Sequence, residues 1–217
     1  MLDSSLARNR MVDLQLVGRG IRNRFVLGAM RMVPREVFVD PGFEELAYED
    51  GAMPIGESQN ISQPYMVALM IEAADVKPGD RVLEVGAGSG YAAAVMSRIT
   101  NYVHAIERHS SLAEAAQQRF SALGYDNVEL RLGDGTLGWP QAETFDAIIV
   151  AAGGPEVPQA LQQQLVIGGR LIMPVGSETL QTLVKVTRRR DDEFEREALR
   201  AVIFVPLIGE QGWAEDG

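Results

Sequence analysis

The pattern of apolar and polar positions along this chain changes near residue 80 and again after Gly176. From about residue 80 to Gly176, short apolar runs predict strands, and the stretches between them predict helices. The predicted strands are Arg81 to Val85, Tyr102 to Ile106, Val128 to Leu132, Ala147 to Val150 and Arg170 to Met173. The predicted helices are Ala92 to Ile99, Leu112 to Leu123 and Val157 to Leu165. This alternation is typical of an α/β fold, a doubly wound and mostly parallel sheet with helices on both faces.

The part before residue 80 has helical periodicity. Leu6 to Val39 carries apolar residues at one-face spacing and predicts N-terminal helices. Asp50 to Pro64 is rich in loop-forming residues, and Met66 to Ala74 again predicts a helix. We therefore expect helices at the N-terminus that are joined to the sheet through a loop-rich segment.

The rhythm changes again after Gly176. Leu180 to Thr187 and Ala201 to Val205 predict two strands. The charged stretch Arg188 to Arg196 between them holds no helix long enough for a crossover, so an antiparallel hairpin is expected at the end of the sheet. The mixed charges of Arg188 to Asp192 are expected in a solvated hairpin turn.

The composition of the chain disfavours several classes of function. The net charge of −10 disfavours sequence-independent binding of nucleic acid, because a surface that binds phosphates is usually basic. The absence of cysteine excludes disulfides and thiolate metal sites. No apolar run approaches the ~20 residues that span a bilayer, and the first residues lack the pattern of a secretory signal. The expected location is the cytoplasm, without a membrane partner.

The most informative motif lies where the first predicted strand ends. Val85 is followed by Gly86-Ala87-Gly88-Ser89-Gly90-Tyr91, a glycine-rich turn that leads into a predicted helix. A dinucleotide fingerprint requires glycine at the position of Tyr91, so the motif strongly disfavours an NAD-dependent dehydrogenase. Glu84 precedes the turn and Glu107 ends the next apolar run. This set is similar to the S-adenosylmethionine (AdoMet) site of Rossmann-like methyltransferases.

Each residue of that set has a chemical reason to hold such a ligand. Gly86, Ala87 and Gly88 would let the ligand approach the backbone, and the two oxygens of Glu107 would accept hydrogen bonds from both ribose hydroxyls. Asp134 with Gly135 would bound the adenine, although this pair alone is also typical of a turn. Because ligands bind at the carboxyl ends of parallel strands, Glu84, Glu107, Asp134 and residues 151–154 are expected to converge on one cleft.

A second polar segment precedes the sheet, where a lid or a substrate loop is expected. It includes Gln59, Ile61, Ser62 and Pro64. Ser62 has two interpretations. It is a natural N-cap for the helix that follows, with Pro64 in the first turn, or it is a residue that contacts substrate.

Other enzyme classes have less support. His104 and His109 lie on either side of Glu107 without the setting of a nucleophile and an acid, which disfavours a Ser-His-Asp hydrolase. No spacing of histidines or cysteines suits a metal, so no metal site is expected. The phosphate-binding pattern G-x-x-x-x-G-K-[ST] is absent.

From about Met11 to Gly209 the chain resembles the protein-L-isoaspartate O-methyltransferases. The matching segments before the glycine turn are Arg19-Gly20-Ile21, Ala47-Tyr48-x-Asp50, Pro54-Ile55-Gly56 and Gln59-x-Ile61-Ser62-x-Pro64. After the turn they include Gly133-Asp134-Gly135, Phe145-Asp146-Ala147-Ile148, Gly168-Gly169-Arg170-Leu171 and Val205-Pro206-Leu207.

The resemblance implies methyl transfer from AdoMet to the free α-carboxylate of isoaspartyl residues in damaged peptides and proteins, which begins repair through a succinimide. It implies that Ser62 is the active-site serine, which orients the substrate carboxylate, and that Gln59, Ile61 and Pro64 bind substrate beside it. It also implies one domain, residues 1–217, in which 1–65 form the N-terminal helical and substrate-loop region and 66–217 the AdoMet-binding core. A monomer is expected.

Three positions depart from the family pattern. Asn60 stands where threonine is usual, Ser58 where glycine is usual and Ala87 where threonine is frequent. Since Ser58 and Asn60 lie beside Ser62, a methyltransferase for another carboxylate or a small molecule stays open as an alternative. A non-catalytic scaffold is a further alternative, which the intact Ser62, Glu107 and Asp134 disfavour. The short C-terminus, Ile208 to Gly217, is expected to give the cofactor pocket at most a contact from Gln211.

Overall fold

A seven-stranded sheet with the order β5-β4-β3-β6-β7-β8-β9 forms the centre of the molecule. The computed structural model describes residues 4–141 and 143–215. The parallel strands are β3 (Arg81–Val85), β4 (Tyr102–Glu107), β5 (Val128–Leu132), β6 (Phe145–Val150) and β7 (Leu165–Gly176). β8 (Gln181–Arg190) and β9 (Glu193–Val202) extend the sheet antiparallel. The predicted parallel sheet and the C-terminal hairpin are both confirmed.

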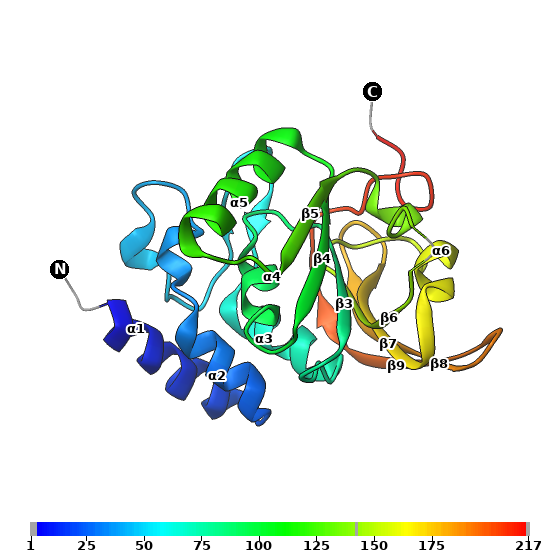
Figure 1. Cartoon of the computed structure of the whole chain (residues 1–217), viewed down its shortest axis with the longest axis horizontal. Helices are drawn as coiled ribbons and strands as arrows, with labels where there is room; N and C mark the ends of the chain where they lie inside the picture. The colour runs from blue at the N-terminus through cyan, green and yellow to red at the C-terminus, as the bar shows by residue number, and fades with distance from the viewer. Residues whose placement is uncertain (1–3, 142, 216–217) are drawn as a thin grey trace.

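Most helices lie on one face of this sheet (Figure 1). They are α1 (Ser4–Met11), α2 (Arg24–Met32), α3 (Pro64–Ala73), α4 (Tyr91–Met96) and α5 (Ser110–Leu123). The short α6 (Gln159–Gln163) lies on the other side. Short 3₁₀ turns occur at Arg35–Val37, Glu44–Leu46 and Gly135–Leu137. Within the described part of the chain, no helix has the length and the apolar character needed to cross a membrane.

The predicted helical stretch from Leu6 to Val39 is interrupted. α1 continues as a π-helical segment, Val12–Leu16, and a 3₁₀ turn, Val17–Arg19, and the chain then turns at Gly20, whose φ is 101°. The side chain of Asn23 starts α2 by accepting hydrogen bonds from the N–H groups of Phe25 and Val26. These two features divide the stretch, because a left-handed glycine ends a helix and an Asn cap begins another.

Other element boundaries were also predicted wrongly, and β7 spans Leu165–Gly176 where only Arg170 to Met173 was predicted. α4 ends at Met96 and not at Ile99, and α6 is shorter than the predicted Val157 to Leu165, since Leu165 already pairs with Phe145 in the sheet. The second hairpin strand was placed at Ala201 to Val205 but runs over Glu193–Val202, which leaves only Asp191 and Asp192 to turn. Charged side chains suit β9 because it is an exposed edge strand, and its pairing with β8 needs no apolar pattern.

The two faces of the sheet have separate cores. Val82, Val103 and Ile149 pack under the N-terminal helices, whereas Leu83 and Ile148 pack on the α6 side. Neighbouring residues of one strand face opposite sides, so strands buried on both faces are apolar almost throughout.

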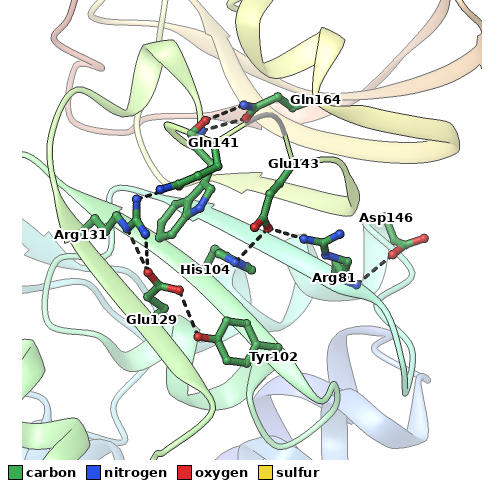
Figure 2. A network of polar contacts seen from close by, with 10 residues as sticks. Arg81, Tyr102, His104, Glu129, Arg131, Gln141, Glu143, Asp146 and Gln164 are labelled. Carbon is green, nitrogen blue, oxygen red and sulfur yellow. Dashed lines mark hydrogen bonds and ion pairs between the residues drawn. The ribbon is translucent and has the colours of Figure 1, made fainter.

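Near β4 and β5 the α6 side is covered by a loop and a polar network rather than by a helix (Figure 2). The Nε2 atom of His104 lies 3.3 Å from a carboxylate oxygen of Glu143, which also pairs with Arg81. The His104 ring packs edge-on against Trp139, with centroids 4.5 Å apart. Burial lowers the pKa of His104, so the ring is neutral near pH 7 and fastens the loop to the sheet.

Candidate active site

A cavity opens at the carboxyl ends of β3, β4 and β6, as expected for a sheet of this type. The residues of the predicted site that line it are Glu84, Gly86, Ala87, Gly88, Glu107, Gly135, Gln59, Ile61 and Ser62. Asp134 and Pro64 do not line it. The fold thus brings the predicted glycine turn, both glutamates and the polar segment around Ser62 to one place.

The glycine turn is held against the neighbouring strand. The N–H groups of Gly86 and Ala87 both donate to the carbonyl of Ile106, at 2.9 and 3.1 Å. Gly88 has a φ of 54°, and a Cβ there would lie 3.2 Å from Cδ1 of Ile55. The turn therefore leaves its backbone open to the cavity on one side, while Ile55 packs closely on the other.

Glu107 is buried and already accepts two backbone hydrogen bonds. Its Oε2 accepts from the N–H of Gly88 at 2.8 Å, and its Oε1 accepts from the N–H of His109 at 2.9 Å. A carboxylate oxygen has two lone pairs, so each oxygen keeps capacity for one more donor. The two backbone bonds fix the carboxylate in the wall of the cavity.

Glu84 is also buried, and its carboxyl is only partly satisfied, by a backbone hydrogen bond from Ala93. Its Oε2 has no hydrogen-bond partner among the described residues, although the side chain lines the cavity. Burial, with the charge of Glu107 as a second cause, raises the pKa of Glu84 well above its usual value. A buried carboxyl with one unpartnered oxygen at a cavity is suited to a ligand that carries a hydrogen-bond donor or a positive charge.

The segment around Ser62 forms another part of the cavity wall. β1 (Met53–Pro54) and β2 (Asn60–Ile61) pair antiparallel, and the chain between them turns back through residues with left-handed φ angles, including Glu57 at 50° and Ser58 at 55°. A carboxylate oxygen of Glu57 accepts a hydrogen bond from the Ser111 hydroxyl at 2.6 Å, which joins this hairpin to the start of α5. Asn60, one of the departures from the family pattern, lines the cavity.

Ser62 is not the N-cap of α3, which corrects one of its two interpretations. The N-cap is Gln63, whose side chain makes no capping bond, and Pro64 occupies the first turn as expected. Because Pro64 has no N–H and fixes its own φ, the helix starts without a hydroxyl cap. The side chain of Ser62 lines the cavity, and no hydrogen bond joins its hydroxyl to the rest of the described chain.

The side chains of Asp134 and Gln211 make hydrogen bonds within the protein that fix the C-terminal segment. Asp134 accepts hydrogen bonds from the N–H of Thr136 at 2.8 Å and from the N–H of Glu210 at 2.8 Å. Gln211 accepts from the N–H of Ala160 at 3.2 Å. A contact of Asp134 with adenine, or of Gln211 with the cofactor, stays a prediction, whereas Gly135 does lie in the cavity wall.

Sequence reasoning missed part of the wall. Arg108, His109 and the segment Val205 to Ile208 also line the cavity, and Ala151 and Ala152 do so as their place after β6 predicts. Arg108 and His109 could have been predicted to line the cavity from the sequence, since they directly follow Glu107. The C-terminal segment had none beyond its match to the family, because only the hairpin β8–β9 carries it back to the cavity.

Comparison with known proteins identifies the family. Residues 7–212 match the model of the protein-L-isoaspartate(D-aspartate) O-methyltransferase family. The chain is 56% identical over 207 residues to protein-L-isoaspartate O-methyltransferase 2 of Pelobacter propionicus, a match that covers 95% of this chain and 92% of the relative. It is 56% identical to the protein-L-isoaspartate O-methyltransferase of Methylorubrum extorquens, over 98% of this chain and 93% of the relative.

Solved structures agree with the sequence matches. A protein-L-isoaspartate O-methyltransferase superposes with a TM-score of 0.85 at 30% identity, over 94% of this chain and 67% of that one. A beta-aspartate methyltransferase from Plasmodium falciparum, in complex with S-adenosyl-L-homocysteine, superposes with a TM-score of 0.81 at 27% identity, over 93% and 98% of the two chains. The chain belongs to the protein-L-isoaspartate(D-aspartate) O-methyltransferase family of AdoMet-dependent methyltransferases.

Proposed function

We propose that the cavity binds AdoMet and that the protein methylates the free α-carboxylate of isoaspartyl residues, with Ser62 orienting that carboxylate. One observation carries the proposal: the same cavity holds the carboxyl of Glu84, the anchored carboxylate of Glu107 and the hydroxyl of Ser62. The first two suit the cofactor and the third suits the substrate. Neither Oε2 of Glu84 nor the Ser62 hydroxyl has a hydrogen-bond partner among the described residues.

The residues that line the cavity fit AdoMet group by group. Glu84 would hold the ammonium of its amino-acid end, since its Oε2 lacks a partner and a positive charge offsets the cost of burying a carboxylate. Glu107 would accept from the ribose hydroxyls with its remaining lone pairs. Gly86 and Gly88 would allow close approach of the backbone, and Gly135 would bound the adenine. When bound, the sulfonium supplies an electrophilic methyl group.

The acceptor needs orientation more than activation. An α-carboxylate is ionised near pH 7 and is its own nucleophile, so no general base is required. Ser62 donates its hydroxyl hydrogen to one carboxylate oxygen and aims the other at the methyl group, which lowers the barrier through position. Gln59 and Ile61, which line the cavity, bind the peptide around it. The methyl ester has a better leaving group than a carboxylate, so the nitrogen of the following peptide bond attacks the ester carbonyl, methanol leaves and a succinimide forms. Its hydrolysis returns some normal aspartate.

The proposed partners are isoaspartyl peptides and proteins, met by a monomer in the cytoplasm without nucleic acid or membrane. The net charge of −10 supports the exclusion of nucleic acid, since such a chain repels phosphates. The absence of cysteine suits a reducing compartment. Asn60 in the cavity wall is the one feature that favours another carboxylate as substrate.

The test is methyl transfer from labelled AdoMet to two peptides that differ only in isoaspartate versus aspartate. We expect base-labile label on the isoaspartyl peptide alone. Label on a small carboxylic acid but on neither peptide would favour the alternative substrate. Binding of AdoMet without transfer to any acceptor would contradict the proposed activity.

A further inference from the structure

Two arginines from distant parts of the chain meet on one tyrosine next to Ser62. The guanidinium carbon of Arg19 lies 3.6 Å from the centre of the Tyr65 ring, and that of Arg200 lies 5.4 Å from it. Arg200 also donates a hydrogen bond to the Tyr65 hydroxyl at 3.1 Å. Both cations are therefore near one ring, and like charges this close repel unless an anion lies between them.

The register of the sheet explains how Arg200 reaches this place. Arg200 pairs with Leu183, so its side chain lies on the face that is covered by the N-terminal helices, where Leu183 is fully buried. β9 is the last strand of the sheet. Arg200 stays exposed while it contacts Tyr65 at the start of α3.

The charges of the two arginines are balanced unequally. Arg19 is paired with both carboxylate oxygens of Asp50, at 3.1 and 3.0 Å, and Gln63 donates to the same carboxylate at 2.7 Å. For Arg200 the described chain offers the Tyr65 hydroxyl but no carboxylate. The group of Arg19, Asp50 and Arg200 thus carries a net positive charge, in a protein whose net charge is −10.

This charge lies beside the proposed substrate position. Tyr65 is three residues after Ser62, and a chain segment of that length spans at most about 11 Å. Residues 205–208, which follow Arg200 by a few positions, line the cavity itself. A peptide whose isoaspartyl carboxylate contacts Ser62 therefore has neighbouring residues within reach of Arg200.

We propose that Arg19, Tyr65 and Arg200 form a subsite for an acidic side chain that flanks the isoaspartyl residue. Arg200 supplies the unpaired charge, Tyr65 holds its guanidinium through the hydroxyl, and Arg19 adds to the positive potential. The inference rests on the proposed substrate position at Ser62. It makes the enzyme selective for damaged sites in acidic sequence context.

The experiment measures kcat/KM for isoaspartyl peptides that differ only in Glu, Gln or Lys at one flanking position, scanned on both sides of the isoaspartate. At the best position we expect the Glu peptide to exceed the Gln peptide about 1.5- to 5-fold, the range of an exposed ion pair, and the Lys peptide to be poorest. The preference shrinks as salt rises from low to about 0.3 M, because exposed charges are screened. Arg200→Gln removes most of the Glu:Gln ratio, and Arg200→Lys keeps part of it.

Arg196→Gln is the matched control, since it removes the same charge from the same strand at an exposed position and should leave the ratio unchanged. An equal Glu:Gln ratio in wild type and Arg200→Gln would overturn the subsite, as would a wild-type preference that salt does not change. If Arg200→Gln fails to fold, the wild-type salt dependence and Arg200→Lys still decide. Failure of wild type to methylate the Gln peptide would instead contradict the substrate position, and the subsite with it.

Discussion

The backbone N–H of Gly88 donates a 2.8 Å hydrogen bond to Oε2 of Glu107, which ties the glycine turn after β3 to the end of β4. The bond fixes the two parts of the proposed cofactor site relative to each other. Because His109 donates to the other oxygen, the carboxylate has two backbone donors before any ligand binds. This arrangement requires a group that accepts on both sides, which a carboxylate does and an amide does not.

Glu107→Gln should therefore weaken AdoMet binding. The amide nitrogen would face either the N–H of Gly88 or that of His109, and one ribose contact would be lost as well. We expect the Kd for AdoMet to rise about 30-fold, equivalent to ~2 kcal/mol for a charged hydrogen bond. Isothermal titration calorimetry measures it, with Glu114→Gln on the exposed side of α5 as the control. An unchanged Kd would show that Glu107 does not contact the ribose.

We expect Glu84 to release a proton when the cofactor binds. Burial raises the pKa of Glu84 in the free protein, so the folded state holds this proton more tightly than the unfolded state. The contribution of Glu84 to stability is therefore present below pH 4.5 and is lost as pH rises through the folded-state pKa. An ammonium partner lowers that pKa and expels the proton, so AdoMet binding should tighten as pH rises across this range. Calorimetry in two buffers of different ionisation enthalpy should detect release of up to about one proton in wild type. Glu84→Gln should lack this component, and equal proton release by both proteins would contradict the assignment.

Ser62→Ala should separate turnover from cofactor binding. The hydroxyl positions the substrate carboxylate, so its loss should lower kcat for the isoaspartyl peptide about 10- to 100-fold, as misplacement of a reactant does. The Kd for AdoMet should stay within about twofold, because other residues hold the cofactor. Ser62→Thr keeps a hydroxyl and should restore part of the activity, while Ser121→Ala, on the exposed side of α5, should have no effect. Full activity of Ser62→Ala would exclude the orienting role.

Gly90→Ala should destabilise the fold. Gly90 has a φ of 88°, and a Cβ there would lie 2.6 Å from Cζ of Phe120 in α5. Strain and overpacking together should lower the free energy of unfolding by about 2–4 kcal/mol, measured by chemical denaturation. Adding Phe120→Leu should recover part of the loss. Gly28→Ala in α2, where a Cβ meets nothing within 4 Å, should instead be neutral or stabilising by up to about 1 kcal/mol.

The sequence alone determined the parallel sheet and the two glutamates of the site, because both depend on local pattern. Apolar runs such as Arg81 to Val85 predict strands, and the carboxyl ends of parallel strands meet at one edge, so Glu84 and Glu107 had to approach each other. The glycine turn was recognisable for the same reason. Its conformation depends on glycines that are adjacent in the chain.

Only the tertiary structure decided what distant segments add. The carboxylate of Asp134 is occupied by the backbone of Glu210, a contact across 76 positions that no local pattern encodes. The charged strand β9 forms because β8 supplies its hydrogen bonds, and it brings Arg200 to Tyr65 across 135 positions. Such contacts depend on which side chains the fold brings together, and sequence spacing carries no information about them.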